Sequence, residues 1–192
     1  MKSVMASLAT AVFAISGCLT GATMANATQA NGIRYTEIGT GAAPVSVKAD
    51  LARALANSAI TNEICYSVHI SNVGWSQSYC NGETVGDYHN QIEAIVMAVS
   101  PDFGEVQYRA HVENIGWQGW VSNGAVAGTQ GQALRMEAMQ AELYNTAEPN
   151  RTISYRVYLP NQGAWDPVEH NGQVAGTTGL GWPITALWVY VS

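Results

Sequence analysis

One pattern of residues occurs three times after about residue 60, and it constrains the fold more than any other feature. The middle copy contains, in order, Tyr108-Arg-Ala-His111, Asn114-Ile-Gly116-Trp117, Asn123-Gly124, Gly128-Thr-Gln-Gly131, Glu137-Ala138 and Leu143. The first copy follows the same order from Tyr66 to Val99, and the third from Tyr155 to Val191. A single copy is too small to bury its apolar face, so we expect the three copies to share one core.

Each copy is expected to form short strands joined by turns. In the middle copy, Tyr108 to Glu113 alternates apolar and polar residues, Trp117 to Ser122 forms a second strand, and Leu134 to Leu143 forms a third. The pair Asn123-Gly124 is typical of a tight turn. Three such copies predict an all-β, pseudo-threefold domain, for which a β-prism is favoured and a β-trefoil is the alternative.

The middle copy resembles a clostridial hydrophobic W (ChW) repeat. The resemblance is closest over residues 108–139, in the run YRAHVENIGWQGWVSNG and in the later segments GTQGQ and LRMEAM. It extends more loosely over residues 63–192, because the first copy lacks the Thr-x-x-Gly of the Gly-rich loop and the third has an inserted Ala164, a Tyr for His and a Thr for Glu. The resemblance implies a module of exported or surface proteins that attaches to polysaccharide or protein.

The beginning of the chain has the layout of a secretory signal. Lys2 precedes an apolar segment, and small residues follow as far as Ala27, so residues 1–27 are expected to be removed. The alternative is a lipoprotein signal over residues 1–17, in which Cys18 would carry a lipid anchor. No later apolar run is long enough to span a bilayer. We therefore expect a secreted protein or one tethered to the cell surface.

The exported chain divides into an arm and a repeat domain. Residues 28–62 form an N-terminal linker or arm, in which Val47 to Ala59 can form one helix capped by Ser46. Residues 63–192 form the three-repeat domain, with copies at 63–100, 104–144 and 150–192.

Two cysteines remain after export, Cys65 and Cys80. An isolated pair in an oxidising compartment is expected to form a disulfide, the alternative being two buried thiols. If they pair across the first hairpin, the same offset places Gln107 opposite Ser122 in the middle copy. That register puts the repeated tryptophans, Trp75, Trp117 and Trp165, on the core face.

The opposite face of the middle copy carries the candidate ligand-binding residues. They are polar or aromatic and lie together in this register: Arg109, His111, Gln118 and Trp120. A flat indole surrounded by hydrogen-bonding groups suits a sugar ring, whose C–H face packs on the indole. The alternative is an Arg–Trp cation–π pair that only shields the sheet. Glu93 and Glu137 are expected to point inward, held by N–H groups of the Gly-rich loop.

The sequence offers little support for other kinds of function. It contains no Gly-x-Ser-x-Gly, His-Glu-x-x-His or phosphate-loop motif, so we expect no enzyme, and its histidines have no metal-ligand spacing. No cofactor is expected. With 8 Lys and Arg against 14 Asp and Glu, the chain has too little positive charge to bind nucleic acid. The favoured function is a non-enzymatic module for cell-envelope or extracellular carbohydrate, and the alternative is a protein–protein adhesion or inhibitor module.

Overall fold

The computed structural model of the chain describes residues 29–30, 33–34, 42–57, 63–144, 146 and 150–192. The expected signal segment, residues 1–27 or 1–17, and the lipidation of Cys18 lie outside the described residues. Two short strands, β1 (Gln29–Ala30) and β2 (Ile33–Arg34), pair with each other near the start of the described chain. One α-helix, α1 (Val45–Leu55), precedes the repeats, and a 3-10 turn (Pro101–Phe103) joins the first copy to the second.

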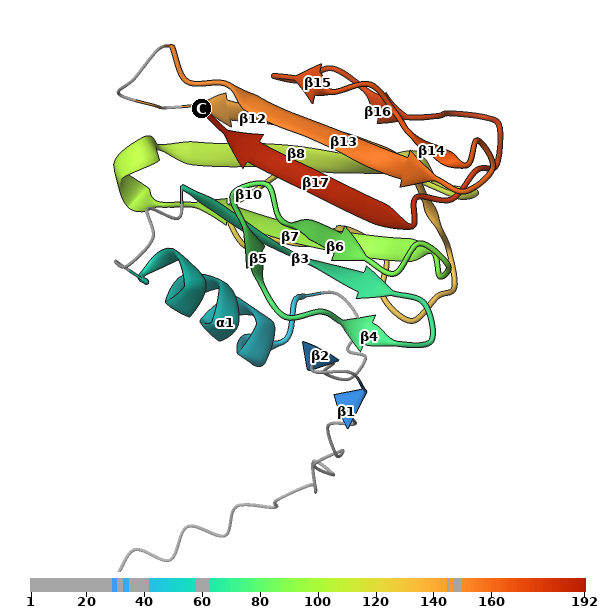
Figure 1. Ribbon diagram of the computed structural model, residues 1–192, viewed down its shortest axis with the longest axis horizontal. Coiled ribbons are helices and arrows are strands. Elements are labelled where there is room, and N and C mark those ends of the chain that lie inside the picture. Colours follow the sequence, from blue (N-terminus) through green and yellow to red (C-terminus); the bar gives the residue numbers. More distant parts are fainter. Residues whose placement is uncertain (1–28, 31–32, 35–41, 58–62, 145, 147–149) are drawn as a thin grey trace, which may run out of the picture.

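Three antiparallel sheets of five strands make up the repeat domain (Figure 1). Sheet one contains β3 (Ile64–Ile70), β4 (Gly74–Trp75), β5 (Tyr79–Cys80), β7 (Ile92–Val99) and β11 (Ala127–Gly128). Sheet two contains β8 (Glu105–Val112), β9 (Gly116–Trp117), β10 (Val121–Ser122), β12 (Met136–Tyr144) and β16 (Ala175–Gly176). Sheet three contains β13 (Ile153–Leu159), β14 (Ala164–Trp165), β15 (Glu169–His170), β17 (Ala186–Val191) and β6 (Thr84–Gly86).

Each sheet takes its fifth strand from another copy of the repeat. β11 of the second copy pairs with β7, β16 of the third copy pairs with β12, and β6 of the first copy pairs with β17. The exchange is therefore cyclic, and it closes the domain. None of the three sheets closes into a barrel, which a β-trefoil would require. The all-β, pseudo-threefold expectation is confirmed, with the three sheets arranged as the sides of a prism.

Glycines make the exchange of strands possible. Gly86, Gly128 and Gly176 end the exchanged strands with positive φ, where a side chain is strained. A Cβ on Gly128 would lie 2.6 Å from the Cα of Ala94, which belongs to the neighbouring copy. Ala94, Ala138 and Ala186 occupy equivalent positions in the three copies, and each faces one of these glycines across a strand pair.

The tyrosine that opens each repeat also joins neighbouring sheets. The Tyr108 hydroxyl on sheet two accepts a hydrogen bond of 3.0 Å from the Met97 N–H on sheet one. Tyr155 on sheet three accepts one of 3.1 Å from Ala141 on sheet two. Tyr66 on sheet one contacts both backbone groups of Val189 on sheet three, at 3.2 and 3.3 Å. Burial raises the pKa of all three phenols, that of Tyr155 to about 12.

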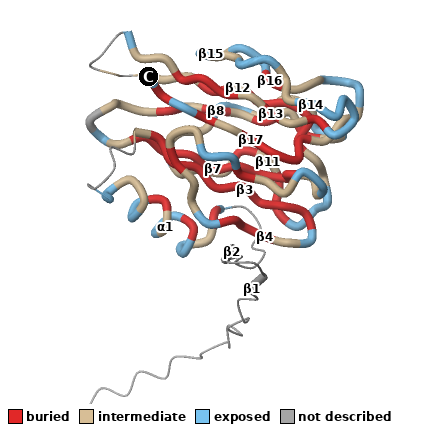
Figure 2. Tube along the Cα trace, viewed as in Figure 1, coloured by how far each residue is buried: buried red, intermediate tan, exposed pale blue. Residues whose placement is uncertain are grey.

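The main core lies between the three sheets and is filled from every copy (Figure 2). Its fully buried members include Tyr66, Tyr108 and Tyr155 together with aliphatic residues such as Ile95 and Met139. None of the three repeated tryptophans belongs to this core. The expectation that they lie on the core face is therefore wrong.

Helix α1 packs along the outer face of sheet one. Leu51 contacts the cluster formed by Cys65, Cys80 and Ala98, and Val47 packs against Trp75. The expected helix is present, but it begins at Val45 after Pro44 and ends at Leu55, so Ser46 lies inside it and makes no cap. Ala59 lies outside the described residues.

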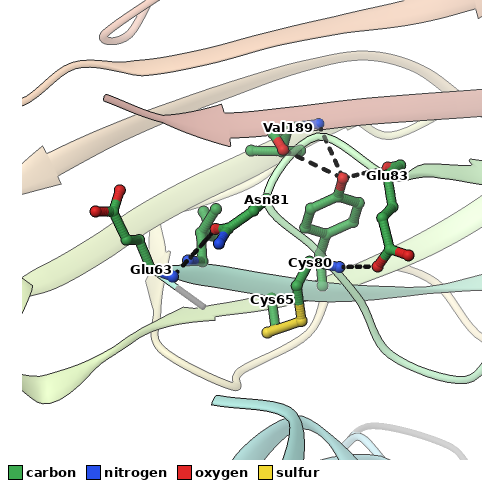
Figure 3. Close-up of a disulfide and its surroundings, with 8 residues drawn as sticks. Glu63, Cys65, Cys80, Asn81, Glu83 and Val189 are labelled. Carbon is green, nitrogen blue, oxygen red and sulfur yellow. Dashed lines mark hydrogen bonds between the residues drawn. A yellow bond between two sulfur atoms is a disulfide. The ribbon is translucent and has the colours of Figure 1, made fainter. Parts of the chain in front are cut away.

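The expected disulfide joins Cys65 to Cys80 beneath α1 (Figure 3). The two residues are directly opposed in the pairing of β3 with β5. The side chain of Asn81 follows in the turn and accepts hydrogen bonds of 3.1 Å from the N–H groups of Glu63 and Ile64. The predicted offset also holds in the second copy, where Ser122 faces Gln107.

Candidate functional site

A bulge in the second strand of each hairpin turns the repeated tryptophan outward. In the second copy, Val121 faces Tyr108 and Trp117 faces His111. Tyr108 and His111 are three positions apart, whereas Trp117 and Val121 are four positions apart, so the second strand of the hairpin contains one extra residue. Because side chains alternate between faces, one extra residue moves every side chain beyond it to the other face. Trp117 therefore lies on the outer face with His111, and the predicted continuous strand from 117 to 122 is interrupted at 118–120.

The same bulge occurs in all three copies. His69 faces Trp75 in the first copy, and Tyr158 faces Trp165 in the third. Each pair packs edge to face, with ring centroids 5.6 Å apart in the first copy, 5.4 Å in the second and 5.7 Å in the third. An aromatic pair thus marks the outer face of each sheet.

The outer face of sheet two carries most of the predicted site. Arg109 lies between two indoles, with its guanidinium carbon 4.7 Å from the centroid of Trp117 and 4.8 Å from that of Trp120. Its Nε donates a hydrogen bond of 2.7 Å to Oε1 of Gln140 on the adjacent strand. Trp120 is 37% exposed, and Arg109 and Trp117 are half-buried. We name Arg109, His111, Trp117 and Trp120 the sheet-two platform.

Gln118 is not part of this platform, because both polar atoms of its amide bind the backbone of Gly128. Its Oε1 accepts a hydrogen bond of 2.6 Å from the Gly128 N–H, and its Nε2 donates one of 3.2 Å to the Gly128 carbonyl. Gln118 therefore ties the hairpin of sheet two to the strand that the second copy places in sheet one. Asp166 occupies the equivalent position in the third copy and accepts a hydrogen bond of 2.8 Å from Gly176.

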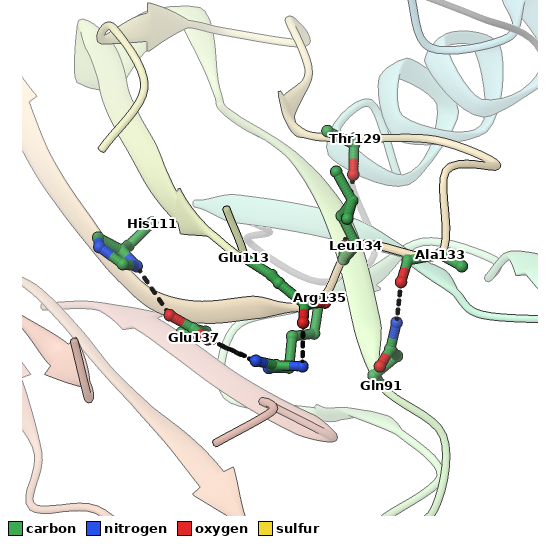
Figure 4. A network of polar contacts seen from close by, with 8 residues as sticks. All are labelled: Gln91, His111, Glu113, Thr129, Ala133, Leu134, Arg135 and Glu137. Atoms are coloured by element: carbon green, nitrogen blue, oxygen red, sulfur yellow. Dashed lines mark hydrogen bonds and ion pairs between the residues drawn. The ribbon is translucent and has the colours of Figure 1, made fainter. Parts of the chain in front are cut away.

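His111 is held from beneath by a buried carboxylate (Figure 4). Its Nδ1 lies 3.2 Å from Oε2 of Glu137, and Glu137 also pairs with Arg135 at 3.1 Å. Arg135 in turn pairs with Glu113. The chain of contacts fixes the ring of His111 against the edge of Trp117 and leaves Glu137 only 5% exposed.

The partner of Glu137 differs from the one expected from the sequence. A register shift between Met136 and Ala138 lets its carboxylate reach His111 instead of the loop N–H groups. The loop N–H of Thr177 donates to the backbone carbonyl of Glu137, at 2.9 Å. Glu93 in the first copy behaves in the same way, with its backbone carbonyl bound by Thr129 and its carboxylate 3.2 Å from Nδ1 of His69.

The equivalent face of sheet one is covered. Ala43 and Val47 of the arm pack against Trp75, which is fully buried and donates a hydrogen bond of 2.8 Å from Nε1 to Gln130. His69 is 1% exposed, and burial lowers its pKa against the opposing attraction of Glu93. The aromatic pair of sheet one is therefore inaccessible.

The outer face of sheet three carries an arrangement that was not predicted from the sequence. The guanidinium carbon of Arg156 lies 4.8 Å from the centroid of Trp165 and 5.5 Å from that of Trp188. The dipeptide Tyr155-Arg156 repeats Tyr108-Arg109, and it was the available sequence signal for this arrangement. The face on which Trp165 and Trp188 lie depends on strand registers that the sequence did not reveal.

Metal-binding clusters and membrane-spanning helices are both absent from the described part of the chain. Among those residues, no three His, Cys, Asp or Glu side chains gather in a group that could hold a metal ion. No helix there is long and apolar enough to cross a membrane.

These features define a three-sheet β domain with an aromatic pair on the outer face of each sheet. The family model described as "Clostridial hydrophobic W" matches residues 111–145, which run from His111 of the platform to one residue past the end of the second copy. The match covers one copy of the repeat, and the other two copies lie outside it. Neither the curated proteins nor the solved structures contain a significant match to this chain.

Proposed function

We propose that the domain is a non-enzymatic binding module of a secreted or cell-surface protein, and that it recognises carbohydrate through the sheet-two platform. The observation that carries the proposal is the exposed indole of Trp120, held 4.8 Å from the guanidinium of Arg109. The family match to the same copy supports a binding module of the cell-surface kind.

The chemistry of the platform suits a sugar ring. An indole face offers a flat apolar surface to the axial C–H groups of a pyranose, and this contact favours the large area of a Trp. A guanidinium has five N–H donors, and Nε of Arg109 uses one of them on Gln140. The remaining donors suit sugar hydroxyls beside the indole.

A binding role fits the surrounding residues better than a catalytic one. Glu137 is a carboxylate that contacts the platform, and it is held by His111 and Arg135 beneath the outer surface. A general acid or base must reach a substrate proton directly or through one water. Glu137 is placed to orient His111, so we assign it a positioning role.

A glycan array with the wild-type domain and the Trp120→Ala variant tests the proposal. We expect glycan binding by the wild type and a loss of at least about tenfold in the variant, as for a residue at the centre of an interface. Trp120→Phe keeps a ring and should retain part of the affinity. Val45→Ala, an 85% exposed apolar residue on α1, serves as the control and should bind as the wild type does.

Two outcomes contradict the proposal. Absence of glycan binding by the wild type would favour the protein–protein module, since Trp and Arg are also enriched in protein interfaces. Glycan binding that survives in Trp120→Ala unchanged would show that sugar is bound, but at another surface.

A further inference from the structure

The outer face of sheet three carries a second cluster of aromatic side chains around an arginine. Arg156 faces Trp188 directly in the pairing of β13 with β17, and Trp165 approaches from the hairpin side. Tyr158 packs edge to face on Trp165, and Tyr190 stacks on Trp188 with centroids 6.0 Å apart. We name Arg156, Trp165 and Trp188 the sheet-three platform.

The two platforms have the same construction but different second tryptophans. Arg109 and Arg156 both follow the repeated tyrosine, and each lies over the repeated tryptophan of its own copy. The second indole comes from the hairpin in sheet two, as Trp120, and from the third strand in sheet three, as Trp188. The two copies therefore place a guanidinium near two indoles in different ways, because the second tryptophan stands at a different position of the repeat in each copy.

The copy whose outer face is covered lacks this sandwich. Ser67 occupies the position of Arg109 in the first copy, and Ser78 the position of Trp120. Ser67 is buried and bonds to the backbone carbonyl of Ser76 at 2.8 Å, while α1 covers the adjacent Trp75. Arginine and a second indole are thus present on the two sheets that α1 does not pack against and absent from the sheet that it covers.

The charge of both arginines is left without a carboxylate in the described part of the chain. The ion pairs there engage Arg53, Arg135 and Arg151, and none involves Arg109 or Arg156. Nε of Arg156 is buried without a hydrogen-bond partner among the described residues. The terminal N–H groups of each guanidinium can bind a carboxylate with two parallel hydrogen bonds. Charge complementarity therefore favours an anionic group at each platform.

We propose that the sheet-three platform is a second ligand site, and that both platforms take a saccharide bearing a carboxylate, such as a uronic or sialic acid. The sugar ring lies on an indole and its carboxylate on Arg109 or Arg156. The inference rests on the proposed carbohydrate function and extends it from one site to two. Because the sites lie on different sheets, the domain can bind two polysaccharide chains or two points along one polysaccharide chain.

Oligogalacturonates and sialyl oligosaccharides, each beside its methyl ester, are the probes that test the carboxylate. The ester keeps the ring and removes the charge, so we expect it to bind about 10- to 150-fold more weakly, the range for a charged hydrogen bond. Equal binding of acid and ester would overturn the assignment of the carboxylate to the arginines.

Titration calorimetry with the tightest acidic oligosaccharide then counts the sites. We expect two sites per wild-type chain, one in Arg109→Gln, one in Arg156→Gln and none in the double variant. Arg53→Gln removes an arginine whose side chain is 76% exposed on α1, so it should retain both sites. On an immobilised polysaccharide, each single variant should also lose the avidity of two-point attachment, a factor of about 100 or more.

The outcomes separate this inference from the proposed function. One site that is unaffected by Arg156→Gln overturns the second site and leaves the first intact. Binding of neutral glycans alone, lost in Trp120→Ala, supports the proposed function and overturns the acidic ligand. Binding to no glycan, acidic or neutral, overturns both. Arg156→Glu gives an independent check, because a repelling charge should abolish the same site, and unchanged urea midpoints show that the variants are folded.

Discussion

Replacing Gly128 with alanine tests whether the exchanged strands hold the domain together. Gly128 ends β11 at a φ of +106°, and an added Cβ would lie 2.2 Å from the carbonyl oxygen of Glu93 and 2.6 Å from the Cα of Ala94. Both contacts are with backbone atoms, so no change of rotamer relieves them. The strand of the second copy must therefore move away from sheet one or distort it.

Gly124 offers a matched control four residues earlier. It also has positive φ, +74°, but a Cβ there meets no atom within 4 Å. Gly124→Ala should therefore cost only the strain of a left-handed backbone, about 1–2 kcal/mol. Gly128→Ala should cost a similar strain plus overpacking of about 1–3 kcal/mol, or about 2–5 kcal/mol in total. The difference between the variants isolates the close approach of the two copies.

Urea unfolding with the disulfide intact measures the difference. With a slope of about 2 kcal/mol per molar urea, the midpoint should fall by about 0.5–1 M for Gly124→Ala and by about 1–2.5 M for Gly128→Ala. Gly176→Ala repeats the test at the equivalent joint between sheets two and three, where a Cβ would lie 2.4 Å from the carbonyl of Glu137. Equal losses in the Gly124 and Gly128 variants would refute the reasoning.

Three further predictions concern stability. Reducing the Cys65–Cys80 bond, which spans 15 residues, should lower the free energy of unfolding by about 3 kcal/mol, measured by urea unfolding with and without reductant; an unchanged midpoint would contradict this. Tyr108→Phe leaves the buried N–H of Met97 unpaired and should cost about 1–3 kcal/mol, whereas the exposed Tyr190→Phe should cost at most about 0.5 kcal/mol. Because the pKa of His69 is lowered on folding from 6.5, the unfolded chain binds its proton first, so stability should fall as pH decreases through about 6.5 toward the folded pKa. His69→Gln should flatten that dependence in a series of urea midpoints, and an equally steep dependence in the variant would rule out His69 as its source.

The repeat in the sequence was sufficient to predict the class of fold. Spacing of the turns and the period-two alternation located the main strands, and the disulfide gave the correct offset for the start of each hairpin. The exchanged strands could not be predicted in this way. β6, β11 and β16 are two or three residues long, and their partners lie in other copies, β6 pairing with residues about 100 positions away.

The site was only partly predictable because of one extra residue in the hairpin. The register that follows from the disulfide places Arg109 opposite Trp120 in the second copy, and the two side chains are in contact in the structure. Beyond the bulge the same register assigns Trp117 and Gln118 to the wrong faces. A signal was available, since Gly119 in the second copy and Pro167 in the third lie at the bulge, and both residue types mark irregularities in strands. To find the bulge, the three copies must be compared for glycine and proline, which disturb strands, and not only for their hydrophobic pattern.

The cyclic exchange of strands makes the three copies indivisible. In a solenoid, a repeat can be removed from the end because each unit contacts only its neighbours. Here the first copy completes the sheet of the third, so the chain forms a ring in which no copy is terminal. A fragment with two copies would expose one unpaired strand edge and retain one unplaced strand, which are complementary surfaces on the same molecule. Such surfaces can join molecules head to tail, whereas in the intact repeat domain the cyclic exchange pairs both of them within one chain.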